Sequence, residues 1–288
     1  MRAVYRHEIS SLFTNLTGYV FAAFLLLFAG IYTMAINIQS AAASFEYVLK
    51  NMSFTFLIIV PVLTMRSVAE EKRQRTDTLL YSLPISMTEV AVGKYAALLT
   101  VFLVPVLIIS LYPLVLSAYG NMYLPAAYGA ILGFFFLGAA LIAVGMFVSS
   151  ASENQTVAAV ITFVLLLVNY FLTSLSGFVS STAFASLVAF SLLAFLLSLL
   201  VRALTKNTFT AMLTLVLLLA ALLLCYVFLE DSFAGLFPAF LEAISLFDRF
   251  EGITEGILDL RVLVFYLSVA GVFLYLTVQS LEKRRWSE

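Results

Sequence analysis

The chain has 288 residues, of which 63% are apolar and 11% are charged, and its formal net charge is −1. Water-soluble domains are about half apolar and about a quarter charged, so this composition indicates a protein that lies in a lipid bilayer. A near-neutral chain with few charges also lacks a basic face for nucleic acid. Its single cysteine, Cys225, cannot form a disulfide within the chain. A secreted disulfide scaffold, a disordered segment and a nucleic-acid-binding protein are therefore excluded.

The first 16 residues mix apolar side chains with Arg2, Arg6 and Glu8, which is not the pattern of a cleavable signal peptide. We expect residues 1–16 to form a helix that lies on the inner face of the membrane. An unstructured polar lead is the alternative.

Apolar stretches of membrane-spanning length follow. We expect about eight spans, near residues 18–38, 51–65, 95–117, 125–149, 156–174, 182–201, 207–229 and 262–281. Six spans remain if the pair 156–174 and 182–201 does not cross the membrane. With the N-terminus inside, twelve of the 15 lysines and arginines fall in cytoplasmic segments, which agrees with the positive-inside rule. The expected fold is an all-α integral membrane bundle, one transmembrane domain over 1–288 with both termini in the cytoplasm.

The cytoplasmic segment 66–93 is long enough to do more than connect two spans. Its charged residues from Glu70 to Arg75 have helical spacing, and Leu79, Leu80 and Leu83 form an apolar edge after them. A charged face beside leucines is typical of a helix that docks on a soluble partner. A solvated loop whose positive charges only fix the topology is the alternative.

The end of this segment carries two boundary signals. Pro84 is expected to end the surface helix, because proline disfavours helical geometry at the residue before it. Ser86 followed by Glu89 is a capping box, which predicts that the next helix starts there.

The outer segment 230–261 contains Pro238 and several phenylalanines and is too apolar for a free loop. We expect one or two short amphipathic helices that lie on the outer face. They could gate a substrate or simply cover the ends of the spans.

Two smaller polar groups are candidate sites. Glu153 and Asn154 lie in a turn between spans, where they could form a second partner contact. The alternative is that Ser152 or Asn154 only caps the next helix. Asn169, Tyr170 and Ser174 lie in a span, where they could line a substrate path or hydrogen-bond to another helix.

The motifs of several enzymes are missing from the sequence. Gly93-Lys94 is the only Gly-Lys pair, and it lacks the first glycine and the Ser or Thr of a phosphate-binding loop. His7 is the only histidine, which argues against a metal centre or a Ser-His-Asp triad. The expected spans contain no ionisable residue for proton coupling. We therefore expect no catalysis and no bound cofactor, and energy must come from a partner.

Several runs resemble one transporter family. Met65–Leu80, followed by Pro84-Ile85-Ser86 and Gly93-Lys94-Tyr95, resembles the first cytoplasmic loop of type-2 ABC exporter permeases. Leu246–Phe250 and the residues after it resemble the last outer loop of the gliding-motility-type branch. Many relatives have Gly in place of Arg75 and an acid in place of Thr78.

This resemblance implies a permease subunit that pairs with a copy of itself or a sister chain. Two cytoplasmic ABC ATPase subunits would bind ATP and Mg²⁺ and tilt the spans by closing. The implied ATPase-coupling residues are Glu70, Glu71, Lys72, Arg73, Arg75, Thr76, Leu79, Leu80 and Pro84. The implied location is the cell membrane, as a multi-pass protein of the bacterial inner membrane.

Two other functions are compatible with the composition. One is a membrane scaffold or immunity protein that transports nothing. The other is a polytopic lipid-modifying enzyme, for which His7 and the scattered acids Asp248, Glu251, Glu255 and Asp259 are a poor set of catalytic groups.

Overall fold

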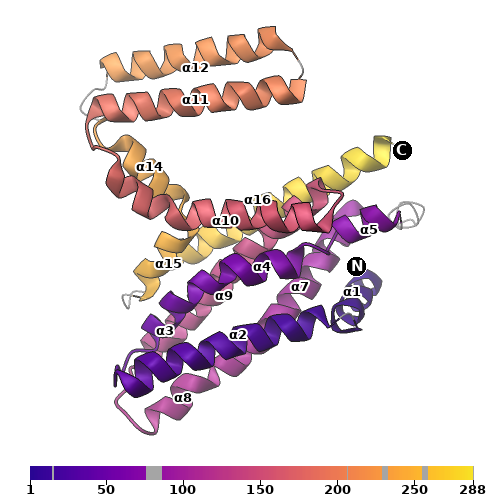
Figure 1. The fold of residues 1–288 in the computed structure, drawn as a ribbon, viewed down its shortest axis with the longest axis vertical. Helices are drawn as coiled ribbons and strands as arrows, with labels where there is room; N and C mark the ends of the chain where they lie inside the picture. Colours follow the sequence, from indigo (N-terminus) through magenta and orange to yellow (C-terminus); the bar gives the residue numbers. More distant parts are fainter. Residues whose placement is uncertain (15, 76–85, 206, 229–232, 255–258, 288) are drawn as a thin grey trace. The chain divides into compact units, whose positions relative to one another are not determined.

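The structure is a computed structural model that describes residues 1–14, 16–75, 86–205, 207–228, 233–254 and 259–287. These residues form helices and no β-strand, so the all-α fold is confirmed (Figure 1). Seven helices among them are long and apolar enough to cross a membrane: Thr17–Gln39, Glu46–Gln74, Met87–Ser117, Leu124–Ala151, Gln155–Phe178, Thr208–Phe228 and Leu260–Arg285. An eighth apolar helix, Ala183–Leu199, is shorter. The seven include Gln155–Phe178, which the six-span alternative omits.

The chain forms two compact units, and the first comprises Met1–Val168 and Leu246–Glu288. Its helices are α1 (Arg2–Thr14), α2 (Thr17–Thr33), the π-helix η1 (Met34–Gln39), α3 (Glu46–Met52), the 3₁₀-helix η2 (Ser53–Thr55), α4 (Phe56–Thr64), α5 (Ala69–Gln74), α7 (Met87–Ile109), α8 (Leu111–Ser117), α9 (Leu124–Ala151), the start of α10 (Gln155–Phe178), α15 (Leu246–Thr254) and α16 (Leu260–Ser287). The expected single transmembrane domain stays a prediction.

Helix α9 is the centre of the first unit, because α3, α4, α7, α15 and α16 all pack against it. Glycines on α9 let these helices approach closely. A Cβ at Gly138 would lie 2.4 Å from the ring of Phe102 on α7. A Cβ at Gly145 would lie 2.3 Å from the hydroxyl oxygen of Thr64 on α4. Only glycine fits at these two crossings.

Aromatic rings fill the space between α4, α7 and α9. The ring of Phe56 stacks on that of Phe134 with centroids 4.5 Å apart, and Phe102 meets Phe56 edge to face at 5.7 Å. Phe135 stacks on Phe102 at 5.6 Å. Phe56, Phe102 and Phe134 are fully buried, so these rings form the rigid core against which the spans are placed.

The N-terminal residues form the helix that the sequence predicts, and the unstructured alternative is wrong for them. Helix α1 packs along α7, where a Cβ at Gly93 would lie 3.3 Å from Val4. The hydroxyls of Tyr5 and Thr100 are hydrogen-bonded at 3.0 Å. The placement of α1 on the inner face of the membrane stays a prediction.

The second unit, Asn169–Ser245, contains the rest of α10 together with α11 (Ala183–Thr205), α12 (Thr208–Phe228) and α14 (Leu236–Ile244). Helices α11 and α12 lie side by side, and α14 packs on α11 (Figure 1). The ring of Phe190 contacts Phe237 at 5.1 Å and Phe240 at 5.5 Å. Most apolar side chains of α12 are exposed, as expected for a helix that faces lipid.

Two short helices, α14 and α15, confirm the prediction of short helices within residues 230–261. In the first unit, Tyr266 on α16 donates a hydrogen bond to the carbonyl of Leu246 at 2.8 Å and so holds the start of α15. The guanidinium of Arg249 lies 3.9 Å from the centroid of the Phe265 ring, a cation–π contact. Whether these helices gate a substrate stays a prediction.

Candidate functional site

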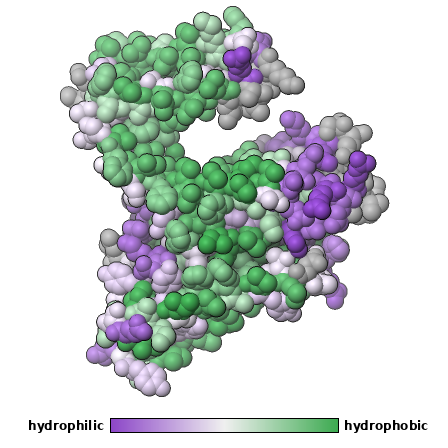
Figure 2. Space-filling view, in the orientation of Figure 1, coloured by the Kyte–Doolittle hydropathy of each residue, from purple (hydrophilic) through white to green (hydrophobic). Residues whose placement is uncertain are grey.

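Charged and polar side chains gather at the end of the first unit where α1 and α5 lie, and Figure 2 shows them as a hydrophilic region beside an apolar surface. We call this region the charged end. It consists of Glu8, Ser67, Glu70, Glu71, Lys72, Arg73, Lys94, Ser149, Ser150, Glu153, Ser280 and Arg284. In the expected topology it faces the cytoplasm.

Lys94 on α7 lies at the centre of the charged end, and its side chain is 1% exposed. Its Nζ donates hydrogen bonds to Oε1 of Glu8 on α1 at 2.5 Å and to Oε1 of Glu71 on α5 at 2.7 Å. A third bond, at 2.9 Å, goes to the carbonyl of Ser67 before α5. An ammonium has three N–H donors, so all of them are used. Lys94 thereby joins α1, α5 and α7.

This cluster depends on every one of its members. Burying a charge costs several kcal/mol unless a partner of opposite sign compensates for it. Two carboxylates face one ammonium, so the cluster carries an excess negative charge. The side chains of Glu8 and Glu71 are 14% and 25% exposed, so water can partly hydrate this charge. Removing Lys94 would leave two carboxylates close together with no cation between them.

Ser149 attaches the start of α5 to the end of α9. Its side chain is fully buried, and Oγ accepts hydrogen bonds from the backbone N–H of Val68 at 3.2 Å and of Ala69 at 3.1 Å. The first N–H groups of a helix have no partner within that helix. Here the serine of another helix takes the place of an N-cap side chain. Its own hydroxyl donates to the carbonyl of Met65 at 3.1 Å.

The next residue, Ser150, ties α5 to the C-terminal helix. Its carbonyl accepts hydrogen bonds from Nζ of Lys72 on α5 and, at 3.0 Å, from Oγ of Ser280 on α16. Close by, Nη1 of Arg284 lies 3.1 Å from Oε1 of Glu153. The Glu153 side chain is 80% exposed, so this ion pair adds little stability. The end of α9 is therefore the point where α5 and α16 meet.

Among the predicted ATPase-coupling residues, Glu71 and Lys72 use their side chains for the internal contacts described above. Glu70 is half-buried, accepts a hydrogen bond from Gln74 at 3.1 Å and lies 3.9 Å from Arg66. Two further residues of this set, Arg73 and Arg75, are exposed and so are accessible to a partner. Thr76, Leu79, Leu80 and Pro84 lie outside the described residues.

Helix α5 ends at Gln74, and the rest of the predicted surface helix, with its expected end before Pro84, lies outside the described residues. Helix α5 ends because of Arg75, whose φ of 55° lies in the left-handed region and stops the helix. Glycine adopts this conformation more readily than any other residue.

Two helix starts are capped as the sequence predicts. Oγ of Ser86 accepts a hydrogen bond from the N–H of Glu89 at 3.2 Å, and α7 begins at the next residue. Oδ1 of Asn154 accepts from the N–H of Thr156 at 2.9 Å at the start of α10. Asn154 is thus a helix cap, and a second partner contact at Glu153 and Asn154 stays a prediction.

The polar residues predicted to line a path lie in the second unit. The amide of Asn169 donates to the carbonyl of Ile244 at 3.1 Å, and the ring of Tyr170 contacts that of Phe171 at 5.5 Å. Ser174 is exposed. The bond made by Asn169 joins α10 to the end of α14, which agrees with the alternative that these polar residues hydrogen-bond to another helix. A substrate path through these residues stays a prediction.

The residues that hold the charged end together are not evident from the sequence. Lys94 lies at the opening of an expected span, and no motif singles out Glu8 or Ser149. One signal could have identified the ion cluster. In the expected topology, Glu8, Glu71 and Lys94 all lie on the cytoplasmic side near the end of an apolar stretch, which puts them at similar depth.

The described residues form seven apolar helices of membrane-spanning length, and one end of the first unit is charged. These features define a multi-pass membrane protein. The sequence matches the ABC-2 family transporter protein family over residues 32–229, which is more than half of the chain. The chain therefore belongs to this family, whose members are the transmembrane permease components of ABC transporters and are not themselves ATPases. No curated protein and no solved structure matches it.

Proposed function

We propose that the chain is the membrane-spanning subunit of an ABC exporter and that a cytoplasmic ABC ATPase moves it by acting on segment 66–93. The observation that carries this proposal is the way α5 is held. Lys94 links it to α1 and α7, and Ser149 and Ser150 link it to α9 and α16. A force on α5 would therefore reach four other helices of the first unit together.

The partner would contact α5 and the residue after it through the exposed Arg73 and Arg75. ATP and Mg²⁺ would bind to the ATPase, in agreement with the absence of a phosphate-binding loop from this sequence. Closure of two ATPase subunits would then push on two permeases at once.

The transporter would contain a second permease, either a copy of this chain or a sister chain. We also propose that the chain belongs to the gliding-motility-type branch, on the support of the run Leu246–Phe250 and the residues after it. The bacterial inner membrane, with both termini in the cytoplasm, is the proposed location. The excess of lysine and arginine in the segments on that side supports this orientation.

Reversing the charge of Arg73 tests the proposed coupling. In proteoliposomes that contain the permease and its ATPase, R73E is expected to reduce the permease-dependent stimulation of ATP hydrolysis about tenfold. The reason is that reversing a charge at an interface removes its complementarity to the partner's surface and weakens binding. The phosphate released per minute, with and without the permease, measures this.

Arg261 offers a matched control, because it is also exposed but lies at the start of α16, on the side expected to face outward. R261E is expected to leave the stimulation unchanged. Stimulation by R73E equal to that of the parent chain would disprove the assignment of α5 as the contact.

A further inference from the structure

The last helix, α16, extends past the end of α9, the helix along which it packs. Oγ of Ser280 donates a hydrogen bond to the carbonyl of Ser150 at 3.0 Å, and α9 ends at the next residue, Ala151. Helix α16 continues from there to Ser287. At a rise of 1.5 Å per residue, these last two turns add about 10 Å. In the expected topology they lie in the cytoplasm.

One side of these two turns is the side that is joined to α5. Nζ of Lys72 on α5 and Oγ of Ser280 donate to the same carbonyl oxygen, that of Ser150. Lys283 lies one turn beyond Ser280 on the same side of the helix, because residues three apart are neighbours on a helix surface. It is exposed and forms no ion pair with any residue that the structure describes. Arg285 is also exposed, but it lies about 140° around the helix from Ser280.

The exposed charges around this point are mostly basic. Lys283 on α16 adds to Arg73 and Arg75 at the end of α5. The exposed carboxylate of Glu153 already has a cation beside it, Nη1 of Arg284 at 3.1 Å. The surface therefore carries an excess positive charge, which an acidic surface of a partner would complement.

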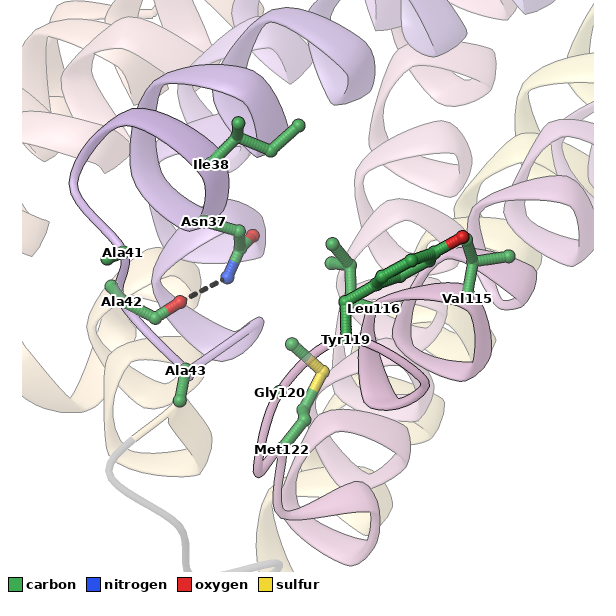
Figure 3. Close-up of a pocket in the computed structure, with 10 residues that line it drawn as sticks. All are labelled: Asn37, Ile38, Ala41, Ala42, Ala43, Val115, Leu116, Tyr119, Gly120 and Met122. Carbon is green, nitrogen blue, oxygen red and sulfur yellow. Dashed lines mark hydrogen bonds between the residues drawn. The ribbon is translucent and has the colours of Figure 1, made fainter.

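The opposite end of the first unit has a different character. There η1 and α8 line a cavity of about 500 Å³, and none of its ten lining residues is charged (Figure 3). Nearby charges are compensated where Nζ of Lys50 lies 3.0 Å from Glu251. A soluble partner with an acidic surface therefore fits the charged end.

The surface of segment 66–93 is small for a protein contact. Its exposed residues, among those that the structure describes, are Arg73, Gln74, Arg75, Ser86, Thr88 and Glu89. A standard interface takes about 20–30 residues and about 800 Å² from each partner, which is a disc about 30 Å across. A partner centred on α5 would also cover a helix that shares a hydrogen-bond acceptor with Lys72.

We infer that the last two turns of α16 are a second contact for the ATPase that acts on α5, and that Lys283 faces an acidic surface of that ATPase. This inference rests on the proposed function and deepens it, because it adds a second helix and gives the partner's surface a charge. Helix α16 packs on α9 and α7, so the ATPase would act on the core of the first unit directly as well as through α5.

The test measures the concentration of ATPase that gives half of the maximal permease-dependent stimulation of ATP hydrolysis, in proteoliposomes of phosphatidylcholine. K283E is expected to raise this concentration about tenfold, and K283R to change it less than about twofold. R285E is the matched control and should also change it less than about twofold, because Arg285 is an exposed basic residue of the same turn on another side of the helix. In about 0.5 M salt the effect of K283E should fall to about threefold, because salt screens exposed charges.

R73E, measured in the same way, separates this inference from the proposed coupling. If R73E weakens the stimulation and K283E does not, α5 is a contact and the inference about α16 is wrong. If K283E alone acts, the contact at α16 stands and the assignment of α5 is wrong, whereas no effect of either variant would overturn both. Equal effects of K283E and R285E would contradict the placement of Lys283. An effect of K283E that appears only after phosphatidylglycerol is added would assign Lys283 to anionic lipid instead and overturn the inference.

Discussion

Replacing Lys94 by methionine is expected to lower the free energy of unfolding by about 3 kcal/mol. The variant keeps the volume of the side chain but leaves the carboxylates of Glu8 and Glu71 together without a cation. Removing one partner of a buried ion cluster typically destabilises a protein by about 3–5 kcal/mol, and the partial hydration of the two carboxylates places this case at the low end. Thermal unfolding of the purified chain in detergent, followed by circular dichroism, measures the change.

Two further variants make this result specific. K50M removes an exposed lysine whose Nζ lies 3.0 Å from Glu251, and an exposed pair contributes less than about 1 kcal/mol. The triple variant K94M/E8Q/E71Q removes the uncompensated charge and should regain most of the lost stability. If K94M unfolds at the same temperature as K50M, the cluster does not hold the charged end together.

Replacing Gly138 by alanine is expected to destabilise the chain by about 1–3 kcal/mol, because one added methyl group overpacks a crossing of two helices. The new Cβ would lie 2.4 Å and 2.5 Å from two ring atoms of Phe102. That ring cannot move away easily, since Phe56 and Phe135 pack against it. The midpoint of denaturant unfolding in mixed micelles measures the loss.

The controls for this prediction separate crowding from a general effect of alanine. A Cβ at Gly271 on α16 meets nothing within 4 Å, so G271A should be neutral or slightly stabilising. Shortening the ring side chain in G138A/F102L removes the two ring atoms and should restore part of the stability. A G138A chain as stable as G271A would show that α7 and α9 do not cross as closely as described.

Much of the fold could be predicted from the sequence, because lipid imposes strong local constraints. Apolar runs of spanning length give the helices, and polar turns give their ends. The cap at Ser86, and that at Asn154 as one of two candidates with Ser152, can be predicted locally, since a cap bonds to the backbone two or three positions away. The helix at Arg2–Thr14 follows from a mixed pattern that is typical of amphipathic segments.

The contacts of the charged end could not be predicted in the same way, because they join residues far apart in the sequence. Glu71 and Lys72 resemble any other charged residues of a surface helix. Their roles depend on Lys94 and Ser150, which approach only when α7 and α9 are packed beside α5. Sequence spacing within a segment carries no information about such a pairing.

Backbone conformation limited the prediction at two other places. Charged residues at helical spacing favoured a longer surface helix, but the left-handed conformation of Arg75 ends α5. The π-helix at Met34–Gln39 and the left-handed Ala41 likewise have no signal in a run of small and apolar residues. The cavity beside them therefore became visible only in the structure.

The most direct test of coupling through α5 is a photo-crosslinking residue placed at Arg73 in living cells, with the same residue at Arg261 for comparison. Mass spectrometry then identifies what each position captures. We expect position 73 to capture an ABC ATPase, identified by peptides of its phosphate-binding loop, and position 261 to capture none. An ATPase adduct at position 261, or no such adduct at position 73 while the transporter is assembled, would contradict the proposed coupling.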